Sequence, residues 1–565
     1  MFELFYRKNN NTLLFSYLEK NGFSDIQNYN PLYSGFFDID ENNYNSINLN
    51  HRWAIQSIND RKDNNNFDIT IGDISGTNTK CNSFFKFSPL LDPVKFMVGK
   101  YKHMETSELC CLPKITDNKC CRKVLDKNNS AYVDSFFSYL SSMLFTNNGF
   151  THGTNFYGSF LSVQNEFKLN VYDDLEYLYD SPFFHKNKNT LFLIDDVDEE
   201  KILSDTRNYR KKIKLDKVED VNIECETINN EMFEGIFHLT TQNLKIHDST
   251  LKEEYSIEVD NKSDKSTKKT SSTCSSRSSN TDDESNEEHS ESNESSLTNS
   301  QMSEYSSMDS EESVNATIYN FPVQVICLEK LDNTLDSLLD DEDKELTDKE
   351  WKSCLFQIIM ILITYQKVFN FTHNDLHTNN VMYIETEKKF INYKYNNRYY
   401  RVPTYGKIYK IIDFGRAIYN FNGKTICSDS YHQKGDAATQ YNCEPYFNQK
   451  KPRLDPNKSF DLCRLGCSLF DYFVEDIDEQ DKIKNPVANL IIEWTKDDKG
   501  RNILYKNNGE ERYPEFKLYK MIVRTVHNHL PEKQIENSMF TSFWSSKKKI
   551  KKQKIINIDN MSSMI

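Results

Sequence analysis

Hydrophobic and polar residues alternate with a period of two in several short stretches, a pattern typical of β-strands with one buried face. Phe67–Ile71 and Ser83–Phe87 alternate in this way, and the glycine-containing segment Gly72–Thr77 separates them as a turn would. Phe156–Val163 and Val323–Leu331 also have strand composition. The pattern predicts a β-rich region that begins near residue 66.

Two other segments repeat their apolar residues at helical spacing. Ala131–Leu144 places most of its apolar residues on one side, and Leu355–Tyr365 is apolar on most faces, as a buried helix would be. Strand patterns follow the second helix at Val381–Ile384 and Ile408–Ile412. The order of elements indicates an α+β protein whose helices dominate the later part.

A long insertion separates the strand at 156–163 from the strand at 323–331. It spans about 170–318, and its stretch 256–315 is rich in Ser, Asn and Glu. Such a composition cannot bury enough apolar surface to offset chain entropy, so we expect this stretch to be disordered. Serines followed by acids, such as Ser285, could accept phosphate, although a solvated tether explains them as well.

Length and charge narrow the class of protein. A chain of 565 residues allows three or four domains, and a net charge of −15 argues against a general nucleic-acid coat. The N-terminus lacks a basic-then-apolar leader, and the apolar run at 355–365 is shorter than the roughly 20 residues that span a bilayer. We expect a soluble intracellular protein without a membrane partner.

The 13 cysteines are scattered or adjacent, which suits reduced thiols. Cys110-Cys111 and Cys120-Cys121 form two doublets that could in principle bind zinc. Zinc ligands are usually spaced by two to four residues, and adjacent cysteines rarely reach one ion. Plain loop cysteines are therefore the favoured interpretation.

The strongest chemical signal is His373–Asn380, followed by Asp413-Phe414-Gly415. The first segment places the carboxylate of Asp375 five positions before the amide of Asn380. The second places a carboxylate directly after an apolar strand. Phosphoryl transfer uses one carboxylate to orient the attacking hydroxyl, and a carboxylate with an amide to hold Mg²⁺ on nucleotide phosphates.

These motifs resemble the protein-kinase family, whose catalytic loop reads H-R-D-L-x-x-x-N and whose metal-binding turn reads D-F-G. The segment Asp461–Phe470 is similar to the family helix whose aspartate braces the catalytic loop. Among kinases, the chain looks most like the divergent proteins of giant DNA viruses. The resemblance covers 320–530 well and the N-terminal part more faintly.

The resemblance implies a bilobal fold with a β-rich N-lobe, a long partly disordered insertion and a mainly helical C-lobe. It divides the chain into an extension of unknown role (1–65), an N-lobe (66–331), a C-lobe (332–535) and a basic tail (536–565). The implied activity is transfer of the ATP γ-phosphoryl group to a Ser or Thr hydroxyl of a protein substrate. ATP and Mg²⁺ are the implied cofactors.

Residue roles follow from the same resemblance. Asp375 would act as catalytic base, and Asn380 and Asp413 would bind the metal. Lys86, flanked by Phe85 and Phe87, is the candidate to hold the α- and β-phosphates, because an inward-pointing lysine needs a partner.

The rest of the expected nucleotide site is less regular. Asp134 stands where the family has a glutamate that pairs with the lysine, and a helix-capping or surface role is equally open. Gly72 and Gly76 would cradle phosphates, although an ordinary hairpin turn explains them equally well. Glu329 to Leu331 would offer backbone groups to adenine.

Three departures from the family pattern concern regulation and charge. Asn374 replaces the arginine of H-R-D, so we expect activity that does not depend on a phosphorylated activation loop, although Ser428, Ser430 and Tyr431 could still be modified. His377 replaces a lysine, and its protonated form could neutralise transferring charge over a limited pH range. Glu444-Pro445 is a poor match to the family's A-P-E, which leaves the peptide-docking surface open.

Two rival functions stay open. The sequence Asp-Leu-His also occurs in aminoglycoside and choline kinases, which phosphorylate small molecules. The irregular glycines and the missing glutamate would suit a pseudokinase scaffold.

The basic run 547–554 could direct nuclear import, but a solvated charge run is the simpler interpretation. A viral chain would act in host cytoplasm or in the virion, and the oligomeric state stays open.

Overall fold

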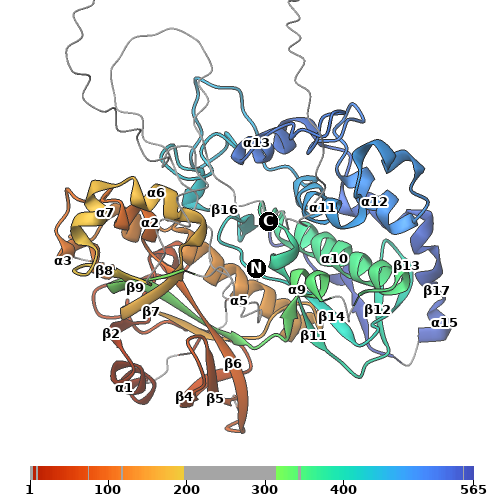
Figure 1. Cartoon of the computed structure of the whole chain (residues 1–565). Helices are drawn as coiled ribbons and strands as arrows, with labels where there is room; N and C mark the ends of the chain where they lie inside the picture. Colours follow the sequence, from red (N-terminus) through yellow and green to blue (C-terminus); the bar gives the residue numbers. More distant parts are fainter. Residues whose placement is uncertain are drawn as a thin grey trace, which may run out of the picture. The chain divides into compact units, whose positions relative to one another are not determined.

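The computed structural model describes residues 4, 6–7, 11–73, 75–115, 119–195, 314–341, 345–550 and 553–565. It is a mixed α and β structure with a curled antiparallel sheet (Figure 1). Among the described residues, seven strands form this sheet in the order β2-β7-β9-β6-β5-β4, with β8 paired to β9. Their bounds are β2 Phe23–Gln27, β4 Ala54–Arg61, β5 Asn66–Gly72, β6 Asn78–Pro89, β7 Phe156–Asn170, β8 Phe192–Ile194 and β9 Asn315–Glu329.

The strands predicted from alternation are confirmed, and most are longer than the patterns that indicated them. Strands β5 and β6 pair antiparallel with Asn66 opposite Phe84 and Gly72 opposite Asn78. Strand β9 then lies between β6 and β7, and Lys86 faces Ile326 across the first of these pairs. This register places Lys86 near the Asn66 end of β5 and Gly72 at the opposite end.

Described residues within 1–65 contribute to the same sheet, although the sequence indicated no role for this segment. Strand β4 pairs with β5 and strand β2 pairs with β7. Helix α1 (Thr12–Lys20) precedes β2 and buries Leu14 and Leu18. The expected boundary at residue 66 therefore falls inside the sheet.

Helix α5 (Ser130–Asn148) contains the predicted segment 131–144 and packs against β7 and β9 (Figure 1). The side chain of Asn129 caps its first turn, and Gly149 ends it in the left-handed conformation with φ 65°. The shorter helices of this region are α2 Pro93–Met97, α3 Thr106–Leu109, α4 Arg122–Leu125, α6 Leu175–Tyr179 and α7 Pro182–Asn187.

The later part of the chain is mainly helical, as predicted. Its helices are α9 Leu335–Asp340, α10 Asp348–Phe369, α11 Phe460–Phe473, α12 Pro486–Trp494, α13 Phe516–Thr525, α14 Pro531–Gln534 and α15 Lys547–Ile550. Helix α10 is twice as long as the apolar run that predicted it, because Thr347 and Glu350 form a capping box upstream. By length and composition α10 is the described helix that could cross a membrane, and 83% of its apolar stretch is buried inside the structure.

Four further small sheets are described, three of them in this later part of the chain and one, β1 with β3, near the N-terminus. Strands β10 (Asn333–Thr334), β11 (Val381–Glu385) and β14 (Lys407–Ile411) form one of them. The others combine β12 Phe390–Tyr395, β13 Arg398–Pro403, β17 Trp544–Ser545 and β18 Ile555–Asn557, then β15 Ile418–Phe421 with β16 Lys424–Cys427, and β1 Tyr6–Arg7 with β3 Asn48–Leu49.

The C-terminal segment expected to be a basic tail is packed into this region. Strand β18 pairs in parallel with β12, and the carboxylate of Asp559 accepts hydrogen bonds from the backbone of Asn396 and Asn397 at 2.7 and 3.0 Å. Met564 also donates its backbone N–H to Val368 of α10 at 2.8 Å. Within 547–554, Lys547 to Lys549 are exposed and Ile550 is buried.

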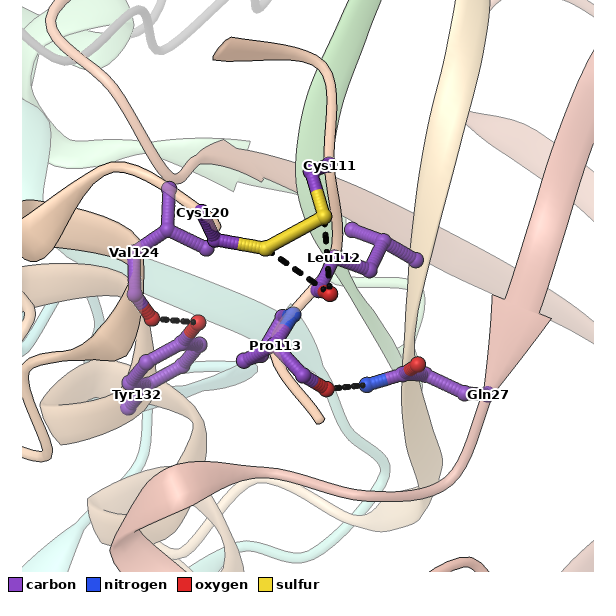
Figure 2. The surroundings of a disulfide bond; sticks show 7 residues. All are labelled: Gln27, Cys111, Leu112, Pro113, Cys120, Val124 and Tyr132. Atoms are coloured by element: carbon purple, nitrogen blue, oxygen red, sulfur yellow. Dashed lines mark hydrogen bonds between the residues drawn. A yellow bond between two sulfur atoms is a disulfide. The ribbon is translucent and has the colours of Figure 1, made fainter. Parts of the chain in front are cut away.

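Two cysteines that the sequence suggested to be reduced form a disulfide. Figure 2 shows Cys111 joined to Cys120, with their Cα atoms 5.3 Å apart, while Cys110 and Cys121 are free thiols. The same loop is tied to its surroundings by a hydrogen bond from Gln27 to the carbonyl of Pro113 at 2.8 Å. The described part of the chain contains no group of three or more His, Cys, Asp or Glu side chains arranged to hold a metal.

The disorder predicted for 256–315 falls almost entirely outside the described residues, as does Ser285. The described ends of the insertion, 171–195 and 314–318, form α6, α7, β8 and the start of β9.

Candidate active site

Lys86 is the centre of a buried charge cluster. Its Nζ lies 2.7 Å from Oδ2 of Asp134 and 3.0 Å from Oδ1 of Asp413. Strand β6 supplies the lysine, α5 supplies Asp134, and the turn after β14 supplies Asp413. Three segments far apart in sequence thus bring together three of the residues that the motifs had selected.

The cluster favours a charged lysine. Burial alone would lower the pKa of Lys86, but the negative charges of Asp134 and Asp413 outweigh burial and raise it. Asp134 is also fixed from the other side, because its Oδ1 accepts the backbone N–H of Phe414 at 2.9 Å. Asp413 has φ 62°, which is in the left-handed region. In this backbone conformation its carboxylate contacts Lys86.

A cavity of about 420 Å³ surrounds the cluster. This volume is within the range usual for small-molecule sites. The residues that line it include Phe84, Lys86, Ser88, Asp134, Leu328, Glu329, Leu331, Asn380, Ile412, Asp413 and Phe414. The lining combines an apolar strand surface with a few charged groups.

The glycines expected to cradle phosphates are not among the described residues that line this cavity. Gly76 lies in the β5–β6 turn with φ 85°, where Asp73 N–H donates to the Thr77 carbonyl at 3.0 Å. That turn is at the end of the hairpin opposite to Lys86, as the register of β5 and β6 requires. The phosphate cradle at Gly72 and Gly76 therefore stays a prediction, and the geometry favours the alternative of an ordinary hairpin turn.

A different turn, between β4 and β5, reaches the cavity. Arg61, Asn64 and Asn65 line it. The turn is closed by Asp63, whose carboxylate accepts the backbone N–H groups of Asn65 and Asn66 at 2.9 and 2.8 Å. Asn65 also exchanges two hydrogen bonds with the backbone of Phe85, at 2.7 and 2.9 Å. The signal for this turn was present in the sequence as Asp63-Asn-Asn-Asn, a typical turn composition.

The end of β9 lines the cavity as expected, but its two candidate residues differ. The backbone N–H of Glu329 is used by the carbonyl of Asn155 at 3.0 Å, and its carboxylate pairs with Lys410 and with Asn155 Nδ2. Glu329 therefore cannot offer its N–H to a ligand in this arrangement. Leu331 is buried and lines the cavity just beyond the strand end, so it is the better placed of the two.

The segment 372–380 is held in place by the helix expected to brace it. Asp461 at the start of α11 accepts the backbone N–H groups of His373 and Asn374, both at 2.9 Å. The His373 ring is hydrogen-bonded to the carbonyl of Ile412 at 2.9 Å. Asn374 adopts φ 66° and is fully buried, and its side chain bonds to Thr372 and Tyr441. The loop geometry is thus fixed by buried polar contacts.

Asp375 lies within this loop, directly after Asn374, and its side chain is one-quarter exposed. Its Oδ1 accepts a hydrogen bond from the Tyr519 hydroxyl at 2.7 Å, and its Oδ2 lies 3.8 Å from Nη1 of Arg416. Burial raises the pKa of Asp375, but Arg416, His377, Arg464 and the Tyr519 hydrogen bond together lower it to about 2. The carboxylate is therefore ionised throughout the neutral range.

Asn380, at the end of the short 3₁₀ turn Thr378–Asn380, joins this loop to the cavity. Its Nδ2 donates to the carbonyl of Asp375 at 2.9 Å and contacts Nε2 of His377 at 3.1 Å. Because the amide nitrogen makes both contacts, its carbonyl oxygen is the atom that would face a cation. Asp413, which also lines the cavity, has a carboxylate.

Burial lowers the pKa of His377 to about 4, and the attraction of Asp375 only partly offsets that effect. The lowered pKa disfavours the protonated ring that the sequence suggested, while Nε2 of the ring lies 3.1 Å from the amide nitrogen of Asn380. The role of His377 in neutralising charge stays a prediction.

The segment after Asp413-Phe-Gly is anchored by two aspartates. Arg416 pairs with Asp436 at 2.7 Å while its backbone carbonyl accepts Asn374 Nδ2 at 3.0 Å. Asp429 lies 2.5 Å from Lys123 Nζ and accepts the N–H of Ser130, the first residue of α5, at 3.0 Å. The candidate modification sites Ser428, Ser430 and Tyr431 are buried beside these contacts.

Comparison with known proteins gives partial matches. A scan of protein-family models finds no match. Over 107 residues, which are 18% of this chain and 8% of the other, the chain is 36% identical to a probable serine/threonine-protein kinase of Dictyostelium discoideum. Over 94 residues, 17% of this chain and 18% of the other, it is 30% identical to a probable kinase of Invertebrate iridescent virus 3. These matches cover less than a fifth of either relative, and they show a likeness to kinases over those segments.

Proposed function

We propose that this chain is an ATP- and Mg²⁺-dependent protein kinase that phosphorylates Ser or Thr hydroxyls. The observation that carries the proposal is the buried cluster of Lys86, Asp134 and Asp413 in a cavity that also holds Asn380, next to the ionised Asp375. Each of these groups has a counterpart in the phosphoryl-transfer machinery of protein kinases.

The proposal includes a bilobal fold. The sheet with α5 would form the N-lobe, and the helical part from α9 to α13 would form the C-lobe. The path β4-β5-β6-β9-β7, with α5 between β6 and β7 in the chain, supports this division. The cavity is lined by both parts, as a nucleotide cleft between two lobes would be.

Lys86 would hold the α- and β-phosphates, because it is charged, buried and fixed by two carboxylates. Leu331 and the apolar lining would contact the adenine. Asn380 Oδ1 and Asp413 would supply the hard oxygen ligands that Mg²⁺ prefers alongside phosphate oxygens. A bound Mg²⁺ would neutralise the charge that develops on the phosphates.

Asp375 would orient the acceptor hydroxyl. In the transfer step, the hydroxyl oxygen bonds to the γ-phosphorus while the bond from that phosphorus to the β–γ bridging oxygen breaks. ADP leaves with the bonding electrons, and the hydroxyl proton passes to Asp375. Since the pKa of Asp375 is about 2, we expect it to contribute mainly by orientation and to take the proton late.

The test uses the full chain with radiolabelled ATP and Mg²⁺, offered casein, a basic protein and a panel of metabolites. The controls are Asp413→Ala, which removes a metal ligand, and Asp375→Asn, which keeps size but removes the base. Labelled phosphoserine or phosphothreonine that both variants lose would support the proposal. Label only in a metabolite would favour a small-molecule kinase, to which the Asp375-Leu-His377 sequence also fits. ATP binding without transfer would leave a pseudokinase.

A further inference from the structure

Tyr519 contacts Asp375 from a part of the chain that carries none of the kinase-like motifs. It lies on α13, is buried, and donates its hydroxyl to Oδ1 of Asp375 at 2.7 Å. Its hydroxyl oxygen in turn accepts a hydrogen bond from Nε of Arg464 on α11 at 2.9 Å. The phenol therefore links Asp375 to a buried guanidinium.

The ring of Tyr519 is held rigidly. It stacks on Phe516 at a centroid distance of 5.3 Å, and the guanidinium of Arg464 lies 5.2 Å from its ring centre. Phe460 of α11 packs against it at 5.7 Å. Burial raises the pKa of the phenol, so the hydroxyl stays neutral and keeps its proton to donate. Because the ring of Tyr519 is packed into the core, its hydroxyl stays beside Asp375.

We infer that Tyr519 is a positioning residue for phosphoryl transfer, which fixes the carboxylate plane of Asp375 so that Oδ2 faces the acceptor hydroxyl. The inference rests on the proposed function. A carboxylate torsion is broad and two-fold when it is unrestrained, so one anchored oxygen removes most of its freedom. Arg416, 3.8 Å from Oδ2, limits the position of the second oxygen.

The effect should appear in the rate and not in nucleotide binding. Tyr519 and Asp375 are both absent from the described lining of the cavity around Lys86, so loss of the hydroxyl leaves the contacts to ATP in place. A misplacement of about 1 Å at a reacting group can cost about 100-fold in rate. Tyr519→Phe keeps the packed ring and removes only the oxygen that links Asp375 to Arg464.

The chain offers a matched control. The hydroxyl of Tyr505 donates to both carboxylate oxygens of Asp471 at 2.9 Å, on the exposed side of α11. Tyr505→Phe therefore removes a tyrosine–aspartate hydrogen bond of the same kind outside the site. Arg464→Met is a second variant, because it leaves the Tyr519 hydroxyl but removes the group that orients it.

The experiment measures kcat, KM for ATP and melting temperature for the full chain and the three variants. The expected result is a 10- to 100-fold lower kcat for Tyr519→Phe, with KM for ATP within two-fold and melting temperature nearly unchanged. Arg464→Met should lower kcat with the same KM, and Tyr505→Phe should match the parent.

Parental kcat in Tyr519→Phe would overturn the inference, as would a parallel loss of kcat, ATP affinity and melting temperature, which would show a merely structural role. A parent chain that transfers no phosphate would overturn the proposed function and this inference together. An active parent with an unaffected Tyr519→Phe variant would overturn this inference alone.

Discussion

Asp134 reaches Lys86 at 2.7 Å although an aspartate side chain is one methylene shorter than the glutamate common at this position of protein kinases. The contact forms because Asp134 Oδ1 is held by the backbone N–H of Phe414, and because α5 packs closely on β7 and β9. The side chain of Asp134 is only 2% exposed. The pair is therefore part of a site shaped for the shorter acid.

We predict that Asp134→Asn lowers kcat/KM for ATP by roughly 10- to 150-fold, because a buried lysine that loses one charged partner loses about 1.5–3 kcal/mol of interaction. Asp134→Glu should not behave as a conservative change, since an extra methylene in a packed site costs about 1–3 kcal/mol. Steady-state kinetics and nucleotide binding test both. Asp173→Asn, the same change at an exposed position, should leave kinetics unchanged. Parental kinetics in Asp134→Glu would show that the site tolerates either acid.

Substitutions in the two hairpin turns should have different effects: one in the β4–β5 turn should raise KM for ATP, and one in the β5–β6 turn should lower stability. Asn65→Ala removes the hydrogen bond to the Phe85 carbonyl that holds the β4–β5 turn over the cavity, and we expect KM for ATP to rise by about three- to ten-fold. Gly76→Ala has space for its Cβ but a φ of 85°, so it should lower stability by about 1 kcal/mol and leave KM unchanged. Steady-state ATP titrations and thermal melts separate the two effects. If KM for ATP rose in Gly76→Ala and not in Asn65→Ala, the result would support phosphate binding at the turn that contains Gly72 and Gly76.

Some of the site could be predicted because its chemistry is local in sequence. Asp375 and Asn380 lie on one short loop, and Asp413 follows a strand that has a clear apolar pattern. Lys86 could be selected because a lysine between two phenylalanines in a strand needs a buried partner. These choices use only nearest neighbours and the period of a strand.

The remaining features depend on contacts between distant segments. Tyr519 is 144 positions from Asp375 and sits in a helix whose sequence has no motif. Strand β4 lies in an Asn-rich segment with weak alternation, and it is a strand because it pairs with β5. The β4–β5 turn was not considered from the sequence, because its approach to the cavity depends on the register of β5 and β6, which the sequence did not specify. The lowered pKa of His377 depends on its burial.

The contact of Asp429 with the start of α5 suggests that a fixed carboxylate orders the segment after Asp413-Phe-Gly. We predict that Asp429→Ala lowers the free energy of unfolding by about 1–3 kcal/mol, because Lys123 and the N–H of Ser130 both lose their partner. Activity should fall with it, since the start of α5 is then less well held. Phosphatase treatment of the parent should leave activity unchanged.

Urea denaturation and hydrogen exchange of the amides at 130–134 would measure this effect. The matched control is Glu479→Ala, which breaks an exposed ion pair with Lys482 and should change stability by less than about 0.5 kcal/mol. Equal stability losses in the two variants, or activity that disappears after phosphatase treatment, would contradict a carboxylate-based anchor.

His152 should make stability depend on pH on the acid side of neutrality. Its ring is fully buried, with Nδ1 facing the carbonyl of Tyr409 and Nε2 facing the hydroxyl of Tyr393, both at 2.7 Å. Burial, aided by the charge of Lys410, lowers its pKa to about 4 from a usual value of about 6.5. The unfolded chain therefore binds a proton between these values that the folded chain does not.

His152 therefore stabilises the folded chain fully above about pH 6.5, and this stabilisation is lost as the pH falls toward 4. Near pH 5 it should add up to about 1.4 kcal/mol per pH unit to the slope of the unfolding free energy. His51, whose pKa burial also lowers to about 4, should act in the same direction. Urea denaturation from pH 4.5 to 7.5 should give a shallower slope for His152→Asn and for His51→Asn than for the parent. The stabilisation from Asp375, whose pKa is about 2, is lost mainly below about pH 4. It therefore changes little between pH 4.5 and 7.5. Identical slopes in the parent and His152→Asn would mean that the buried ring takes up its proton as readily in the folded chain as in the unfolded one.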